Sequence, residues 1–150
     1  MPFEAQDPRF AERIHASFAR QRVMAHLGAE LLEVRAGYCR IQLPCRPELT
    51  QQHGYIHAGI VGTIADSAGG YAGYTLMPPD SSVLTVEYKL NLLAPASGDR
   101  LVAEGHVVRA GRTLVICRAD VLAQRGAEET VCATLLQTLM TMHGKPDRAS

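Results

Sequence analysis

The segment between His57 and Met77 constrains the fold of this 150-residue chain more than any other part of the sequence. It reads HAGIVGTIADSAGGYAGYTLM, a run of small and apolar residues that contains one carboxylate, Asp66, and ends directly before Pro78 and Pro79. Proline stops a helix because it lacks the backbone N–H and its ring clashes with the preceding turn. The sequence therefore predicts one long α-helix, with Asp66 near its middle.

Five glycines lie on the same face of this predicted helix as Asp66. At about 100° per residue they fall within about 60° of the carboxylate, as does Thr63; they are Gly59, Gly62, Gly69, Gly70 and Gly73. Together they cost about 5 kcal/mol of helix propensity relative to alanine, so something must offset that cost. Because glycine has no Cβ, such a face lets a narrow ligand or another backbone approach closely. Two interpretations follow: a ligand site beside Asp66, or a helix wrapped tightly by a sheet.

The charge balance argues against several classes of partner. There are 15 Lys and Arg residues against 15 Asp and Glu residues, so nucleic acid and anionic membranes are not expected to bind. A membrane-spanning helix is disfavoured because a central Asp66 would cost about 2.5 to 3.5 kcal/mol on insertion. The N-terminal segment lacks the basic and apolar regions of a secretion signal, so we expect a cytoplasmic protein.

The cysteines and histidines do not have the spacing of a metal site. The four cysteines contain no C-x-x-C pair, and we expect reduced thiols that pack in the core; they are Cys39, Cys45, Cys117 and Cys132. His53 and His57 are four residues apart, but they flank a loop-to-helix junction and no third ligand is evident. We therefore predict that no metal is bound.

The rest of the chain predicts one α+β domain over residues 1–150, with flexible ends at 1–7 and 144–150. Residues 8–27 place Phe10, Ile14, Phe18 and Val23 at helical spacing with charges between them, which predicts one amphipathic helix with these side chains on its apolar face. Residues 29–44 alternate apolar and polar side chains around Gly37, which predicts a hairpin or a bulged strand. Four strand-like runs follow the glycine-rich helix, and the last three are close enough in sequence to form an antiparallel meander; they are VLTVEYKLNLLAP, GDRLVAEGHVVRAG, RTLVICRADVLAQ and ETVCATLLQTLMTM.

The string HAGIVGTIAD followed by SAGGYA resembles the helix signature H-G-G-x-x-x-x-L-x-D of the PaaI-like acyl-CoA thioesterases. These belong to the hotdog superfamily, and the order of predicted elements is similar over nearly the whole chain. The resemblance implies a curved antiparallel β-sheet wrapped around a long central helix, here with an added N-terminal helix. It also implies an acyl-CoA substrate, no cofactor beyond the CoA of that substrate, and a homodimer or homotetramer with sites between subunits.

Residue by residue, the resemblance assigns Asp66 as the catalytic carboxylate, acting as general base or as nucleophile. His57 matches the motif histidine, and we expect it to fix the start of the helix. Ala58 matches the residue whose backbone N–H polarises the thioester carbonyl from the helix N-terminus. The family usually has glycine there, so Ala58 keeps the donor but adds a methyl group that narrows the site. Gln51 matches an Asn or Gln that orients water or the thioester, although the adjacent Gln52 could match the same position if the alignment shifts by one residue.

Further positions carry weaker resemblance. Thr85 matches a Ser or Thr that assists from the neighbouring strand in some relatives. Arg112 and Thr113 resemble a G-[RK]-[TS] turn near the pantetheine or phosphate of CoA, although Arg112 is equally interpreted as a solvated turn cation. Four residues of the Asp66 face are expected to line the substrate; they are Gly59, Gly62, Thr63 and Gly70.

The resulting hypothesis is hydrolysis of an aryl- or fatty-acyl-CoA to free acid and CoA. Two alternatives remain: a hotdog protein that binds acyl-CoA without cleaving it, and a hotdog enoyl-CoA hydratase or dehydratase. Retention of Asp66 in an apolar groove argues against the first. The second resembles other signatures, in which an acid and a histidine are placed together. The acyl group is not specified by the sequence.

Overall fold

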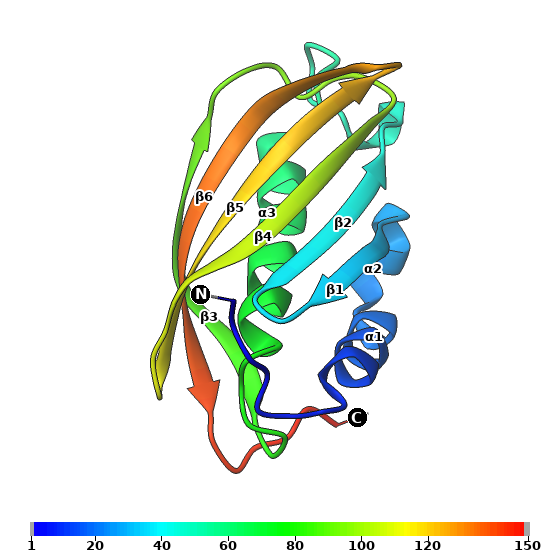
Figure 1. The fold of residues 1–150 in the computed structure, drawn as a ribbon. Helices are drawn as coiled ribbons and strands as arrows, with labels where there is room; N and C mark the ends of the chain where they lie inside the picture. Colours follow the sequence, from blue (N-terminus) through cyan, green and yellow to red (C-terminus); the bar gives the residue numbers. More distant parts are fainter. Residues whose placement is uncertain (1, 149–150) are drawn as a thin grey trace.

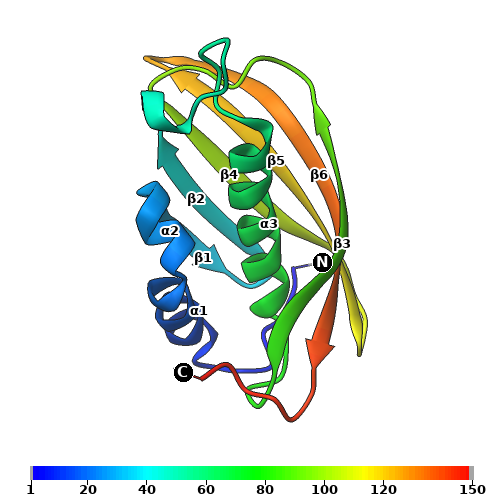
Figure 2. The ribbon, with the colours of Figure 1, turned by 180° about the vertical axis from the view of Figure 1, so that it is seen from behind.

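A computed structural model describes residues 2–148 of the chain and confirms the predicted hotdog architecture. One antiparallel six-stranded sheet, in the order β1-β2-β4-β5-β6-β3, curves around the central helix α3 (Figures 1 and 2). The elements are α1 (Phe10–Arg20), α2 (Arg22–Leu27), β1 (Glu30–Arg35), β2 (Tyr38–Pro44), the 3₁₀ turn η1 (Pro47–Leu49), α3 (Ala58–Tyr74), β3 (Ser82–Leu92), β4 (Arg100–Ala110), β5 (Leu114–Arg125) and β6 (Glu128–Met142).

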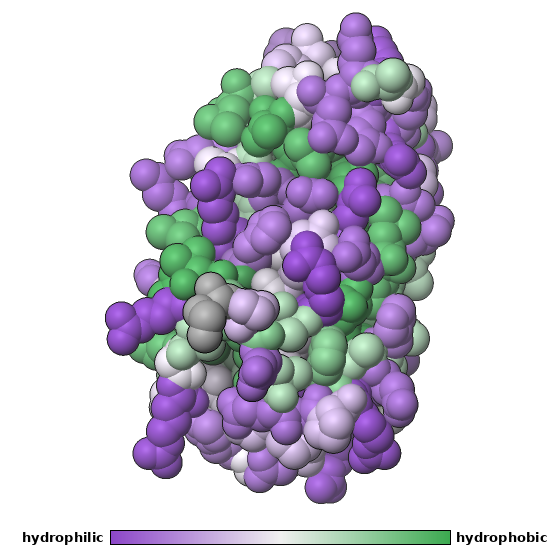
Figure 3. Space-filling model, in the orientation of Figure 1, coloured by the Kyte–Doolittle hydropathy of each residue, from purple (hydrophilic) through white to green (hydrophobic). Residues whose placement is uncertain are grey.

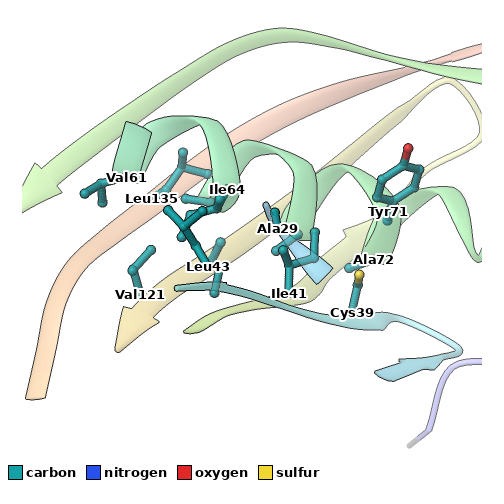
Figure 4. Packing of buried hydrophobic residues seen from close by; sticks show 14 of the residues in the cluster. Ala29, Cys39, Ile41, Leu43, Val61, Ile64, Tyr71, Ala72, Val121 and Leu135 are labelled. Atoms are coloured by element: carbon teal, nitrogen blue, oxygen red, sulfur yellow. The ribbon is translucent and has the colours of Figure 1, made fainter. Parts of the chain in front are cut away.

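The core lies between α3 and the concave face of the sheet. Figure 4 shows Val61 and Ile64 of α3 among buried side chains of β2, β5 and β6. Gly105 of β4 lets the two layers come close, because a Cβ at this position would overlap the backbone of Ala68 in α3. The glycine-rich helix is therefore wrapped tightly by the sheet along part of its length.

The amphipathic segment at the N-terminus forms two helices, so the prediction of one helix over residues 8–27 is wrong. Gln21 has an extended backbone with ψ of 93° and separates α1 from α2. Its side chain bonds both Tyr71 and Ser67 of α3. The break turns α2, so that Met24 is buried and Val23, predicted to face the core, is 45% exposed.

The strand predictions are confirmed. β1 and β2 form a hairpin at Gly37, whose φ of +78° suits glycine. β4, β5 and β6 form the antiparallel meander, and within residues 2–148 β3 pairs with β6 alone. β3 is therefore an edge strand, and its apolar side chains Leu84, Val86 and Tyr88 are each about half exposed. On the face of the sheet turned away from α3, apolar patches lie among polar side chains (Figure 3).

Three of the four cysteines are buried free thiols, as expected for core residues. Burial raises the pKa of Cys39 and Cys117 to about 12 and that of Cys132 to about 11, which keeps these thiols protonated. Cys45 is only partly buried.

Of the ends predicted to be flexible, residues 1, 149 and 150 lie outside the described residues. Within the described part, the Gln6 side chain donates to the Leu76 carbonyl and Asp7 is buried; flexibility of the ends stays a prediction. None of the helices described over residues 2–148 is long and apolar enough to cross a membrane.

Candidate active site

Asp66 lies in the middle of α3 and is held by two side chains from the sheet. The Thr85 hydroxyl of β3 donates to Asp66 Oδ1 over 2.7 Å, and the Gln137 amide of β6 donates to the same oxygen over 2.8 Å. Within residues 2–148 no hydrogen bond reaches the other carboxylate oxygen, Oδ2. The carboxylate is thus fixed through one oxygen, while the other retains its lone pairs for an incoming group.

A pocket of about 270 Å³ adjoins this carboxylate. Most of its lining side chains carry hydroxyl, amide or carboxylate groups; the pocket is lined by Ser17, Gln21, Asp66, Ser67, Gly70, Tyr71, Ser82, Val83, Thr85 and Asp147. The Tyr71 hydroxyl accepts from the Gln21 amide over 2.9 Å and lies 3.2 Å from the Ser17 hydroxyl. Ser17 of α1 and Gln21, which separates α1 from α2, therefore form one wall of the pocket, and that wall is polar.

The N-terminus of α3 forms a second pocket, of about 250 Å³. His57 is the N-cap residue, and its Nδ1 accepts from the Gly59 N–H over 2.8 Å, which agrees with the expectation that His57 fixes the helix start. The Ala58 N–H makes no hydrogen bond within the described chain. Gln51 lines the same pocket, and its Oε1 accepts from backbone N–H groups of the following turn.

The predicted catalytic residues therefore fall into two groups within one copy of the chain. Gln51, His57 and Ala58 line the pocket at the helix start, whereas Asp66 and Thr85 line the other pocket. Ala58 and Asp66 are eight residues apart in α3, which is about 12 Å at about 1.5 Å per residue. A donor that stabilises an oxyanion must lie within about 3 Å of it. One copy alone does not bring these two groups to the same reacting carbonyl.

The glycine face of α3 serves two different purposes. A Cβ at Gly69 would overlap the Gln137 amide, and one at Gly73 would overlap Leu139, so these two glycines allow close packing against the sheet and leave no space for a ligand. Gly70 has nothing within 4 Å of its Cβ position and borders the Asp66 pocket. The interpretation as close packing against the sheet thus holds for Gly69 and Gly73, whereas a ligand site beside Asp66 and Gly70 stays a prediction.

The other predicted substrate residues are dispersed. Gly59 is exposed in the first turn of α3, Gly62 faces Tyr88 and Leu90 of β3, and Thr63 donates to the Gly59 carbonyl. Arg112 and Thr113 are exposed in the β4–β5 turn and line neither of the two pockets. Over the described residues, no three His, Cys, Asp or Glu side chains are grouped to hold a metal ion.

Gln137 is the partner of Asp66 that the sequence did not reveal. It is 71 residues from Asp66 along the chain and sits in an apolar strand run, LLQTLM, where nothing marks it as functional. Its position opposite Asp66 depends on the curvature of the sheet. Its alternation with Leu135 and Leu139, which face the core, is the signal that could have shown that it points inward.

Comparison with known proteins shows the family to which the chain belongs. Residues 53–130 match the thioesterase superfamily. A candidate esterase of Saccharolobus solfataricus is 31% identical over 118 residues, covering 79% of this chain and 76% of that protein. The crystal structure of a thioesterase family protein from Silicibacter pomeroyi is 47% identical, with a TM-score of 0.88 over 90% of this chain and 99% of that one.

The fold is shared more widely. The PaaI protein of the E. coli phenylacetic acid degradation operon has a TM-score of 0.83 at 17% identity, over 93% of this chain and 97% of that one. The resemblance to PaaI-like proteins seen in the helix signature is thus confirmed for the fold. Because the family match spans just over half of the chain and agrees with the architecture around α3, the chain belongs to the thioesterase superfamily of hotdog-fold hydrolases.

Proposed function

We propose that the protein hydrolyses an acyl-CoA thioester, with Asp66 as the reacting carboxylate. The observation that carries the proposal is the asymmetric hydrogen bonding of Asp66, whose Oδ1 accepts two bonds while Oδ2 has none in the described chain. A carboxylate with one immobilised and one free oxygen beside a pocket is suited to general-base or nucleophilic chemistry. No cofactor is needed, since CoA is part of the substrate.

Two reaction courses are compatible with this carboxylate. As a general base, Asp66 takes a proton from water while the water oxygen attacks the thioester carbonyl. The tetrahedral intermediate then collapses, the C–S bond breaks, and CoA leaves as the thiolate, which takes up the proton from Asp66. As a nucleophile, Asp66 attacks the carbonyl itself, CoA leaves as the thiolate, and water then hydrolyses the anhydride. In both courses negative charge develops on the carbonyl oxygen, and a backbone N–H at a helix N-terminus stabilises it. The free N–H of Ala58 fills that role.

The donor and the carboxylate come from different copies of the chain. Because Ala58 and Asp66 are about 12 Å apart in one helix, a homodimer is required to place them on one thioester. The edge strand β3 carries Thr85 next to a row of half-exposed apolar side chains. A long apolar edge of this kind pairs readily with another strand, so a second copy is expected to meet the chain along β3. Pairing of two such dimers would give the tetramer.

The remaining predicted residues orient the reacting groups or border the substrate. Thr85 orients Asp66, Gln51 orients the water or the thioester, and His57 caps the start of α3, where Ala58 acts. Gly59, Gly62, Thr63 and Gly70 border the substrate along α3. Arg112 and Thr113 would meet CoA only from the partner copy, since they line no pocket with Asp66 in their own chain.

The pocket beside Asp66 favours an aryl-sized acyl group over a long alkyl chain. The pocket has a volume of about 270 Å³, and the hydroxyl and amide groups of Ser17, Gln21, Ser67 and Tyr71 that line it already bond one another. A long alkyl chain would have to break these bonds to enter, and the separated groups would then be buried without partners. A compact acyl group leaves their mutual hydrogen bonds intact.

The test is release of free thiol from benzoyl-CoA, hexanoyl-CoA and palmitoyl-CoA by wild type and by Asp66→Asn. Asp66→Asn keeps the shape but removes the base and nucleophile, so kcat is expected to fall at least about 100-fold, with benzoyl-CoA the best wild-type substrate. Near wild-type turnover by Asp66→Asn would overturn the proposal. Tight binding of intact acyl-CoA by wild type would indicate a binding protein instead, and hydration of crotonyl-CoA without thiol release would indicate a hydratase.

A further inference from the structure

Gln137 is a buried polar side chain whose hydrogen bonds all go to Asp66. Only 1% of the residue is exposed. Its Nε2 lies 2.8 Å from Asp66 Oδ1 and 3.4 Å from the Asp66 carbonyl oxygen. Its Oε1 is buried and has no donor within residues 2–148. Half of the amide is thus satisfied by Asp66, and the other half is left without a partner.

The unpaired oxygen follows from the orientation that Asp66 imposes. Turning the amide by 180° would place Oε1 against two acceptor oxygens of Asp66, the carboxylate and the carbonyl, and repulsion excludes that arrangement. Nε2 must therefore face Asp66, and Oε1 must face α3. A buried acceptor without a donor destabilises a fold, and such a group in a native protein calls for an explanation.

Packing alone does not explain a glutamine at this position. Leu135 and Leu139 flank Gln137 on the same face of β6, are equally buried and are apolar. An apolar side chain of similar length would fill the same space without leaving an unpaired oxygen. The amide is thus retained for the hydrogen bond that it donates to Asp66.

The absence of a Cβ at Gly69 leaves the space that the Gln137 side-chain amide occupies. A Cβ at Gly69 would overlap Gln137 Oε1 and lie 2.8 Å from its Cδ. No alanine fits there unless the amide moves away from Asp66. The helix therefore carries glycine at this point because the side chain of Gln137 occupies the Cβ position.

We propose that Gln137 is a positioning residue for the hydrolytic reaction, and that Gly69 makes room for it. Gln137 of β6 and Thr85 of β3 both donate hydrogen bonds to Asp66 Oδ1. These two bonds fix the rotation of the carboxylate so that its Oδ2 faces the reacting group. Gln137 acts through Asp66 and does not itself touch the substrate. The inference rests on the proposed role of Asp66 and adds the residues that set the geometry of the carboxylate.

The first test is Gln137→Met, which keeps the length and volume of the side chain and removes the N–H donor. With benzoyl-CoA, kcat is expected to fall about 10- to 100-fold while KM changes by less than about threefold, because alignment is lost and binding is not. A melting temperature near that of wild type is expected, since the unpaired Oε1 is removed as well. A folded Gln137→Met enzyme with kcat within about twofold of wild type would overturn the proposal.

The second test uses the glycines of α3. Gly69→Ala should reproduce the loss of kcat, because its Cβ displaces the amide, whereas Gly73→Ala should lower only the melting temperature, because its Cβ overlaps Leu139 and touches nothing bonded to Asp66. In a Gln137→Ala background, which frees the space, Gly69→Ala should cause no further loss of kcat. Equal losses of kcat with and without Gln137 would show that Gly69 acts in another way and would overturn its assignment.

Asp66→Asn distinguishes a failure of the positioning role of Gln137 from a failure of the proposed hydrolytic function. An inactive Asp66→Asn with a fully active Gln137→Met would refute only the positioning role. A fully active Asp66→Asn would refute the proposed function and the positioning role together.

Discussion

At the scale of single residues, Ala58 offers a sharp test because only its backbone is proposed to act. It is the first residue of α3, a position at which proline is well tolerated in helices. His57 has an extended backbone with ψ of 138°, which is the conformation that a following proline requires. Ala58→Pro therefore removes the N–H while leaving the fold in place.

We predict that Ala58→Pro lowers kcat for benzoyl-CoA about 100- to 1,000-fold, the usual effect of losing one oxyanion donor. Steady-state kinetics and a thermal melt on the same preparation measure the loss and confirm folding. Ala58→Gly is the matched control, since it keeps the N–H and restores the residue usual in the family. Unchanged kcat in Ala58→Pro would exclude this N–H from the reaction.

At this scale, the sequence predicted features that depend on residues close to one another in the chain. The position of Asp66 in the middle of a helix and the capping role of His57 could be predicted, because a helix and its N-cap depend on residues close in sequence. Gln137 could not, since its contact with Asp66 arises only when β6 curves against α3. The same holds for Gly69, which the sequence grouped with the glycines thought to leave room for a ligand.

At the scale of elements, Arg13 of α1 holds the C-terminal end of α3. Its guanidinium donates to the carbonyl oxygens of Tyr74, Met77 and Pro78 over 2.6 to 2.9 Å and lies 4.2 Å from the centre of the Tyr74 ring. Asp7 lies 3.6 Å from the same group. A cation at these carbonyls satisfies groups that a helix end leaves unpaired and complements the helix dipole.

We predict that Arg13→Met lowers the free energy of unfolding by about 3 kcal/mol, because several charge-assisted hydrogen bonds are lost at once. Urea denaturation measures the change. Arg109→Met, at an exposed arginine on β4, is the control and should change stability by less than about 0.5 kcal/mol. Equal stabilities of the two variants would show that Arg13 does not anchor α3.

At the same scale, the apolar spacing of the N-terminal segment predicted its buried face only in part. The apolar spacing over residues 8–27 correctly predicted that Ile14 is buried. The spacing missed the break at Gln21, whose side chain bonds Tyr71 and Ser67 of α3, residues that are distant in sequence. The strands were predictable because alternation and turn glycines mark them, but the exposure of β3 at the sheet edge depends on strand order, which local patterns do not encode.

At the scale of the whole molecule, the proposed function requires two copies of the chain to complete each site. In the proposed dimer, each copy supplies Asp66 to one site and the Ala58 N–H to the other. Two different inactive variants can therefore restore each other: in a mixed dimer of Asp66→Asn and Ala58→Pro, one site carries both defects and the other carries none.

The most direct measurement is thiol release from benzoyl-CoA by that mixed dimer, purified through a different affinity tag on each copy, beside the two parent homodimers. Each homodimer is expected to be nearly inactive, because both of its sites carry one defect. The mixed dimer is expected to show about half of the wild-type kcat, since one of its two sites is intact. A mixed dimer as inactive as its parents would contradict a site built from Asp66 of one copy and Ala58 of the other.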